Sequence, residues 1–114
     1  MKVIRKVIVL SLIILSSASL KAQKVFEVDA DWKADVKIYV ADAGWKADLL
    51  VFKVDADWKA GENNGKWFFT QYENQAKKSI FFVPYENQAD LKIFFVDYEN
   101  QAGWRNAAKK QLLY

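Results

Sequence analysis

The chain has 114 residues, no cysteine, no histidine and a formal net charge of +3. The missing residue types exclude a disulfide framework, a thiol nucleophile, and histidine as a general base or metal ligand. Apolar residues make up 53% of the chain and aromatic residues 16%, too much for a disordered segment. We therefore expect one small domain that is held together by packing alone.

Residues 1–22 have the pattern of a secretory signal peptide. Three basic residues precede the apolar run Val7–Leu15, and small residues are frequent in Ser16–Ala22. The apolar run is much shorter than the roughly 20 residues that cross a membrane, so we expect no membrane span after removal of the leader. Cleavage after Ala22 is predicted, although small residues allow an earlier cut. The predicted location is therefore periplasmic or secreted.

Removal of this leader changes the sign of the net charge. Four of the 17 basic residues lie in the leader and all 14 acidic residues follow it, which leaves 13 basic and 14 acidic residues. The predicted mature chain thus has a net charge of −1. Since a domain that binds nucleic acid is expected to be basic, we expect no nucleic acid partner.

Residues 23–114 are predicted to form a single domain of six repeats and a tail. Three tryptophan-type units, at about 25–60, carry DADWKAD, DAGWKAD and DADWKAG, and three tyrosine-type units, at about 66–102, carry YENQA. The motifs recur every 13 residues within each half, and the turn cluster Gly61–Gly65 separates the halves. The repeated aromatic residues are Trp32, Trp45, Trp58, Tyr72, Tyr85 and Tyr98.

The segment between successive motifs predicts one β-strand in each unit. VKIYV, LLVFK, KSIFFV and LKIFFV are rich in β-branched and aromatic residues and contain no glycine. Two consecutive large apolar residues at the centre of each strand, such as Ile38 and Tyr39, point to opposite faces, so both faces need cover. A second half that winds back around the first would provide this cover. We therefore expect an all-β, solenoid-like and interwound domain of six 13-residue repeats.

The tandem V-D-x-[DE]-x-x-A-D-[LV]-K-[IV] units resemble those of the septoil-knot domain, a small bacterial family of unknown function. The resemblance extends from about Val25 to the tail. It implies a chain path that is a torus knot with seven crossings, formed by two interwound halves. The tail 103–114 would then be the threading end, folded as a short helix or plug with Trp104, Leu112 and Leu113 as its apolar contacts.

The acidic residues of the repeats do not predict a metal or catalytic site. Asp29, Asp31 and Asp35 resemble the start of a calcium loop, but the glycine and glutamate that complete such a loop are missing. Their recurrence every 13 residues indicates a structural role, because an active site is normally unique. We expect no enzyme activity, no metal and no cofactor.

Trp32, Trp45 and Trp58 are the candidate ligand-binding residues. Evenly spaced indoles flanked by Asp and Lys could form a row of flat platforms for a glycan chain. Alternatively, they are corner residues that pack over strand ends and supply core area, since a repeat places aromatic residues evenly whether or not they bind anything. The sequence favours this packing interpretation, and favours it also for the tyrosines.

Two functions are consistent with these features. The first is an exported, non-catalytic structural or interaction protein, and the second is a small carbohydrate-binding module that uses the tryptophans. The partner, a glycan or an envelope protein, is not identified by the sequence. We expect a monomer rather than an oligomer.

Overall fold

The computed structural model describes residues 22–114, so the predicted leader lies outside the described residues apart from Ala22. Each of the six repeats contributes one strand, as predicted, and the tail contributes a seventh. No helix in residues 22–114 is long and apolar enough to cross a membrane. The strands are β1 (Lys24–Glu27), β2 (Val36–Val40), β3 (Leu49–Lys53), β4 (Lys66–Phe69), β5 (Lys78–Phe82), β6 (Leu91–Phe95) and β7 (Gly103–Trp104).

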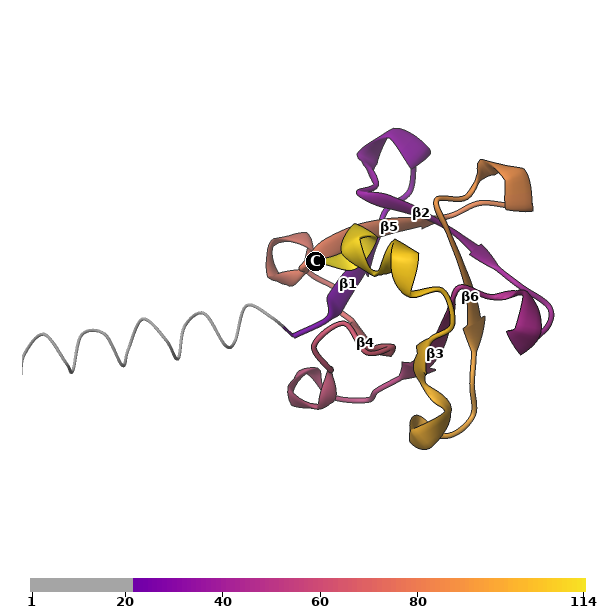
Figure 1. Ribbon diagram of the computed structural model, residues 1–114. Helices are drawn as coiled ribbons and strands as arrows, with labels where there is room; N and C mark the ends of the chain where they lie inside the picture. Colours follow the sequence, from indigo (N-terminus) through magenta and orange to yellow (C-terminus); the bar gives the residue numbers. More distant parts are fainter. Residues whose placement is uncertain (1–21) are drawn as a thin grey trace, which may run out of the picture.

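The six repeat strands form a closed parallel barrel in which the two halves alternate (Figure 1). The order is β4-β1-β5-β2-β6-β3, and β4 pairs with β3 to close the barrel. Strands of the tryptophan half, β1 to β3, therefore pair only with strands of the tyrosine half and with β7. The predicted interwound arrangement is confirmed: each strand of one half lies between two strands of the other half in a single barrel wall.

The seam between β3 and β4 is completed by the tail. β4 pairs with only Phe52 and Lys53 of β3, whereas β7 runs antiparallel to Leu49 and Leu50 at the other end of the same strand. Because β6 occupies the opposite edge of β3, β4 and β7 share one edge. The end of the chain thus fills the part of the wall that the repeats leave open.

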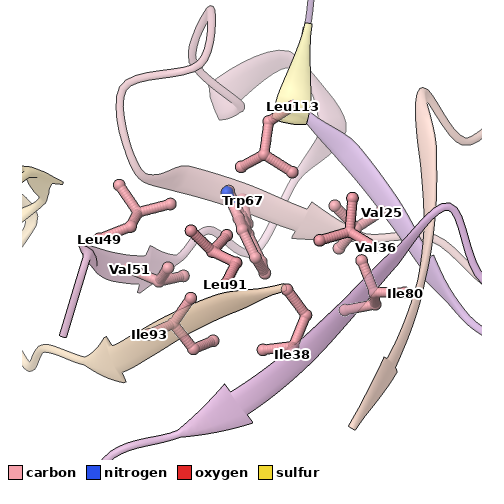
Figure 2. Close-up of a cluster of buried hydrophobic side chains, with 10 residues drawn as sticks. All are labelled: Val25, Val36, Ile38, Leu49, Val51, Trp67, Ile80, Leu91, Ile93 and Leu113. Atoms are coloured by element: carbon pink, nitrogen blue, oxygen red, sulfur yellow. The ribbon is translucent and has the colours of Figure 1, made fainter. Parts of the chain in front are cut away.

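Side chains that alternate along the strands fill the inside of the barrel (Figure 2). In β2, for example, Val36 and Ile38 are buried while Lys37 between them faces outward. Small β-branched residues and leucines supply most of this core, and Trp67 of β4 supplies its one fully buried indole among residues 22–114. The core residues are Val25, Val36, Ile38, Leu49, Val51, Trp67, Ile80, Leu91, Ile93 and Leu113.

A short 3₁₀ turn on the outside of the barrel, here called a corner, follows each repeat strand (Figure 1). Corners contact strands of the other half, as η1 does with β5 and η2 with β6. The large apolar residues on the outer faces of these strands, such as Tyr39 and Phe81, are partly buried. The corners are η1 (Asp31–Lys33), η2 (Gly44–Lys46), η3 (Asp57–Lys59), η4 (Glu73–Gln75), η5 (Glu86–Gln88) and η6 (Glu99–Gln101).

The aspartate that ends the repeat motif ties its corner to a strand of the other half. In each case a carboxylate oxygen accepts a hydrogen bond from a backbone N–H of the strand that the corner crosses, which satisfies a donor of the barrel wall. The recurrence of this aspartate is therefore structural, as the sequence indicates. The bonds join Asp35 to Ser79 at 2.9 Å, Asp48 to Lys92 at 3.0 Å, and Asp90 to Lys37 at 2.9 Å.

The C-terminal 3₁₀ helix η7 (Ala107–Leu113) plugs the barrel. Leu113 is fully buried in the core, and Leu112 and Trp104 pack against it. The Trp104 indole donates to the Asn63 carbonyl at 2.8 Å, and the Asn63 side chain donates to the Lys110 carbonyl at 2.9 Å. The predicted plug and its three apolar contacts are confirmed, and the turn between the halves is one of the segments that hold it.

Candidate functional site: the aromatic corners

The three predicted ligand-binding tryptophans are exposed. The exposed fractions are 79% for Trp32, 72% for Trp45 and 78% for Trp58. The interpretation that these indoles supply core area is therefore wrong. Strand residues already fill the barrel, so a corner that crosses its outer surface has little left to pack against. The buried tryptophan is instead Trp67, which lies in a strand outside the repeated motif.

Each exposed indole is held by a lysine–aspartate pair, and the three residues together are called a clamp here. The lysine ammonium lies over the indole at a distance typical of cation–π contacts, and also bonds an aspartate four residues earlier. The lysine thus links the aspartate to the indole and favours one direction of the indole, while most of the indole stays exposed. The clamps are listed with two distances, the first from the lysine Nζ to the carboxylate oxygen and the second from the lysine Nζ to the centre of the indole ring. They are Asp29–Lys33–Trp32 (2.9 and 5.2 Å), Asp42–Lys46–Trp45 (2.9 and 5.1 Å) and Asp55–Lys59–Trp58 (2.8 and 5.1 Å).

The clamp lysines also stabilise the charged form of the clamp aspartates. Hydrogen bonds from the lysines, and then their positive charge, lower the pKa of Asp29, Asp42 and Asp55. A carboxyl group that acts as a general acid near neutral pH needs a raised pKa instead. These acids are thus suited to orient the lysines. Within residues 22–114, no three acidic side chains are grouped as metal ligands.

The six aromatic corners are distributed around the barrel, and the tryptophans do not form a straight row. Figure 1 shows corners of the two halves alternating around the wall. Tyr72, Tyr85 and Tyr98, which precede η4, η5 and η6, are also exposed, so their predicted packing role is wrong as well. Each tryptophan therefore has a tyrosine-type corner as its neighbour. A single straight glycan chain lying on all three indoles, as the sequence suggested, is not compatible with this arrangement.

A cleft of about 700 Å³ lies between corners η1 and η5. Trp32 forms part of one wall, and Phe81 and Pro84 supply further apolar surface. The amide side chains of Asn87 and Gln88 also line the cleft, and both residues are exposed. Aromatic surface and uncharged donors and acceptors therefore face the same open cleft, together with the charged side chains of Asp31 and Lys37.

Two other clefts lie between a tryptophan-type and a tyrosine-type corner and are related by the repeat. One of about 480 Å³ is lined by Trp58, Lys59, Lys53 and Glu99. The other, of about 280 Å³, includes Glu73. Their walls are mainly charged. The corners thus form surfaces of two kinds, one with amides and one with ion-pairing residues.

A closed parallel barrel in which two sets of three repeats alternate defines a class of interwound β-repeat domains. The family model described as the 7(1) septoil knot domain matches residues 22–105, and the chain belongs to this family. The resemblance inferred from the V-D-x-[DE] motif is thereby confirmed. Neither the search of curated proteins nor the search of solved structures gave a significant match.

The amides of η5 were not among the candidate residues identified from the sequence. Asn87 and Gln88 belong to the YENQA motif, which was interpreted as structural, and they adjoin Trp32 only because β5 lies between β1 and β2. The feature of the sequence that could have drawn attention to this corner is Pro84, the one proline of the chain, which makes the fifth unit different from its neighbours.

Proposed function

We propose that the protein is an exported, non-catalytic interaction protein that binds its partner through the aromatic corners. The observation that supports this function most strongly is the exposure of three indoles, each fixed by its own lysine and aspartate. Indoles bury a large area on contact and lose little conformational freedom, so they are effective binding residues. Export is supported by the pattern of residues 1–22.

A small carbohydrate-binding module is the second candidate function. The cleft between η1 and η5 supports it, since an indole and two amides line the same space. Under this function the glycan contacts one corner pair at a time, and other copies of the tryptophan motif take no direct part in the same site.

The test compares the binding of the protein to isolated cell-envelope fractions with that of a triple variant, Trp32→Ala, Trp45→Ala and Trp58→Ala. We expect the wild type to sediment with the envelope and the triple variant to stay in solution. A parallel variant with Tyr72, Tyr85 and Tyr98 replaced by alanine measures the contribution of the tyrosine-type corners separately. Equal sedimentation of wild type and tryptophan variant would refute the proposed role of the indoles.

Export is tested separately by fractionating cells that express the full-length chain. We expect the protein in the periplasm or the medium, with a new amino terminus at Gln23. Recovery of an unprocessed chain from the cytoplasm would contradict the proposed export and leave the binding experiment to be judged alone.

A further inference from the structure

We propose that the cleft between η1 and η5 is a binding site for a neutral glycan, with Trp32 as the platform on which a sugar ring stacks. The proposal rests on the proposed function of the aromatic corners and narrows it to one of the three clamps. The proposal assigns glycan binding to the first tryptophan-type repeat and not to the other two, although Trp32, Trp45 and Trp58 share one motif and one type of clamp.

The lining of the cleft matches the two surfaces of a sugar. A pyranose ring has a C–H face, which stacks on aromatic and apolar surface, and a rim of hydroxyl groups, which both donate and accept hydrogen bonds. Trp32, Phe81 and Pro84 provide the apolar surface. Asn87 and Gln88 each carry an amide with two N–H donors and one carbonyl acceptor. Lys33 lies over the Trp32 indole and is anchored by its clamp aspartate, so the platform is oriented before a ligand arrives.

The charges at the cleft favour an uncharged ligand. Asp31 and Lys37 both line it, so that one negative and one positive side chain are present. The two charges balance each other, so the lining provides no net attraction for a strongly anionic or cationic chain. Carboxylate and ammonium groups also bond sugar hydroxyls, and such hydrogen bonds to charged groups are stronger than neutral ones.

A peptide that binds as an added strand does not fit this cleft. Such a peptide needs a strand with a free edge. Strand β5, which contributes Phe81, pairs with β1 on one edge and β2 on the other. Strand β2, which contributes Lys37, pairs with β5 and β6. The backbone around the cleft is thus already paired, and recognition depends on side chains.

The equivalent surface at Trp45 has the same aromatic and amide residue types, as Phe94, Asn100 and Gln101, but differs in its packing and at three other positions. A Cβ atom added at Gly44 would lie 3.4 Å from the Leu50 side chain and 3.6 Å from that of Phe94, so apolar side chains lie against this corner. Three positions that line the first cleft have different residues one repeat later. Asp31 is replaced by Gly44, Lys37 by Leu50, and Pro84 by Asp97.

Trp58 is also less suited to a neutral ligand. The repeat is interrupted directly after its corner by the turn Gly61–Gly65. The cleft that Trp58 lines corresponds by the repeat to the one beside Glu73 and not to the one between η1 and η5. It has Lys59, which bonds Asp55 at 2.8 Å, and Glu99, which bonds Lys66 at 3.1 Å. A sugar placed there would have to desolvate these ion pairs without amides to replace the water.

The experiment titrates the exported protein with neutral oligosaccharides and follows tryptophan fluorescence and heat. The probes are cellohexaose, laminarihexaose and chitohexaose, and the anionic comparison is oligogalacturonate. We expect saturable binding of at least one neutral probe. Trp32→Ala should weaken it by about tenfold or more, whereas Trp45→Ala and Trp58→Ala should change it by less than about twofold. Circular dichroism checks that each variant is folded, which the exposure of all three indoles favours.

Lys37→Leu supplies an independent variant, because leucine is the residue that the second repeat has at this position. We expect it to weaken binding while leaving the Trp32 indole in place. Equal losses from all three tryptophan variants, or a loss from Trp45→Ala or Trp58→Ala alone, would overturn the assignment to this cleft. Binding of the anionic probe alone, or of no probe, would overturn the neutral glycan. In either case, envelope binding that the triple variant abolishes would leave the proposed function intact.

Discussion

Asp48 accepts a hydrogen bond from the backbone N–H of Lys92 at 3.0 Å, and thereby joins residues that are 44 positions apart. The same carboxylate also accepts a hydrogen bond from the side-chain amide of Asn106 at 3.3 Å and lies 3.4 Å from the ammonium of Lys109. Its backbone carbonyl accepts from the N–H groups of Arg105 and Asn106. One residue therefore connects both halves of the barrel and the tail.

Replacing Asp48 by alanine should destabilise the protein by about 2–3 kcal/mol, because a buried group that accepts several hydrogen bonds is lost and its donors stay unpaired. The control is Asp35→Ala, which removes two bonds to Ser79 at an exposed site and should cost about 1 kcal/mol. Urea unfolding measures both. Equal effects of the two substitutions would contradict the central role of Asp48.

Stability should also fall in acid through Asp48. Burial raises the pKa of this carboxyl, but the Lys92 N–H, Asn106 and Lys109 together bring the pKa below its usual value. A folded-state pKa below the unfolded one, about 3.9, means that its contribution is complete above that pH and is lost as pH falls through the folded-state pKa. Unfolding free energies measured from neutral to acid pH should therefore converge for the wild type and Asp48→Ala. A constant difference between them across this range would contradict the expected linkage.

The clamp aspartates give a prediction for single sites. Carbon-detected NMR titration should place the carboxyl pKa values of Asp29, Asp42 and Asp55 below the ordinary aspartate range, because a lysine bonds each of them. Lys46→Met should return the pKa of Asp42 towards its ordinary value and leave the other two unchanged. Ordinary values in the unsubstituted protein would show that the clamps do not persist in solution.

Leu113→Ala should cost about 2–5 kcal/mol, since it opens a cavity where the plug enters a closed core. Leu112 is adjacent in the chain but only partly buried, so Leu112→Ala is the matched control with a smaller effect. Thermal unfolding compares the two variants. A larger loss from Leu112→Ala would mean that the tail enters the barrel by another side chain.

Gly65→Ala should be strongly destabilising. Gly65 has a φ of +89°, and an added Cβ would lie 2.4 Å from the Leu50 carbonyl oxygen, which is backbone and cannot move aside. The control is Gly44→Ala, whose nearest contact is an ordinary one to the Leu50 side chain. Chemical denaturation should separate the two variants, and similar stabilities would refute the expected strain.

Fluorescence quenching tests the exposure of the indoles directly. Iodide should quench Trp32, Trp45 and Trp58 readily, whereas Trp67 should emit at shorter wavelength and resist quenching. In a variant with the three corner tryptophans replaced by alanine and the partly buried Trp104 by phenylalanine, Trp67 is the one tryptophan that remains, and its emission should be blue-shifted. Readily quenched emission from that variant would contradict the burial of Trp67.

The repeat pattern predicted much of the fold but little of the corner geometry. Consecutive apolar residues such as Ile38 and Tyr39 indicated strands with two covered faces, and the separate blocks of motifs indicated interwound halves. Strand order depends on pairing between distant residues, such as Val25 with Lys78, and no local pattern specifies it. The exposure of Trp32 was missed because hydrophobicity favours burial on average, whereas the corner has no remaining interior to enter.

The alternation of the two halves has a consequence for the time course of folding. β1, β2 and β3 do not pair with one another, so the first half of the chain has no native sheet until strands from the second half arrive. The residues that pair β1 with β5 are separated by 53 positions, and such distant contacts form slowly because a long loop must close first. Folding should therefore be a late cooperative event, and a nascent chain that stops before β4 should remain unstructured and sensitive to proteases.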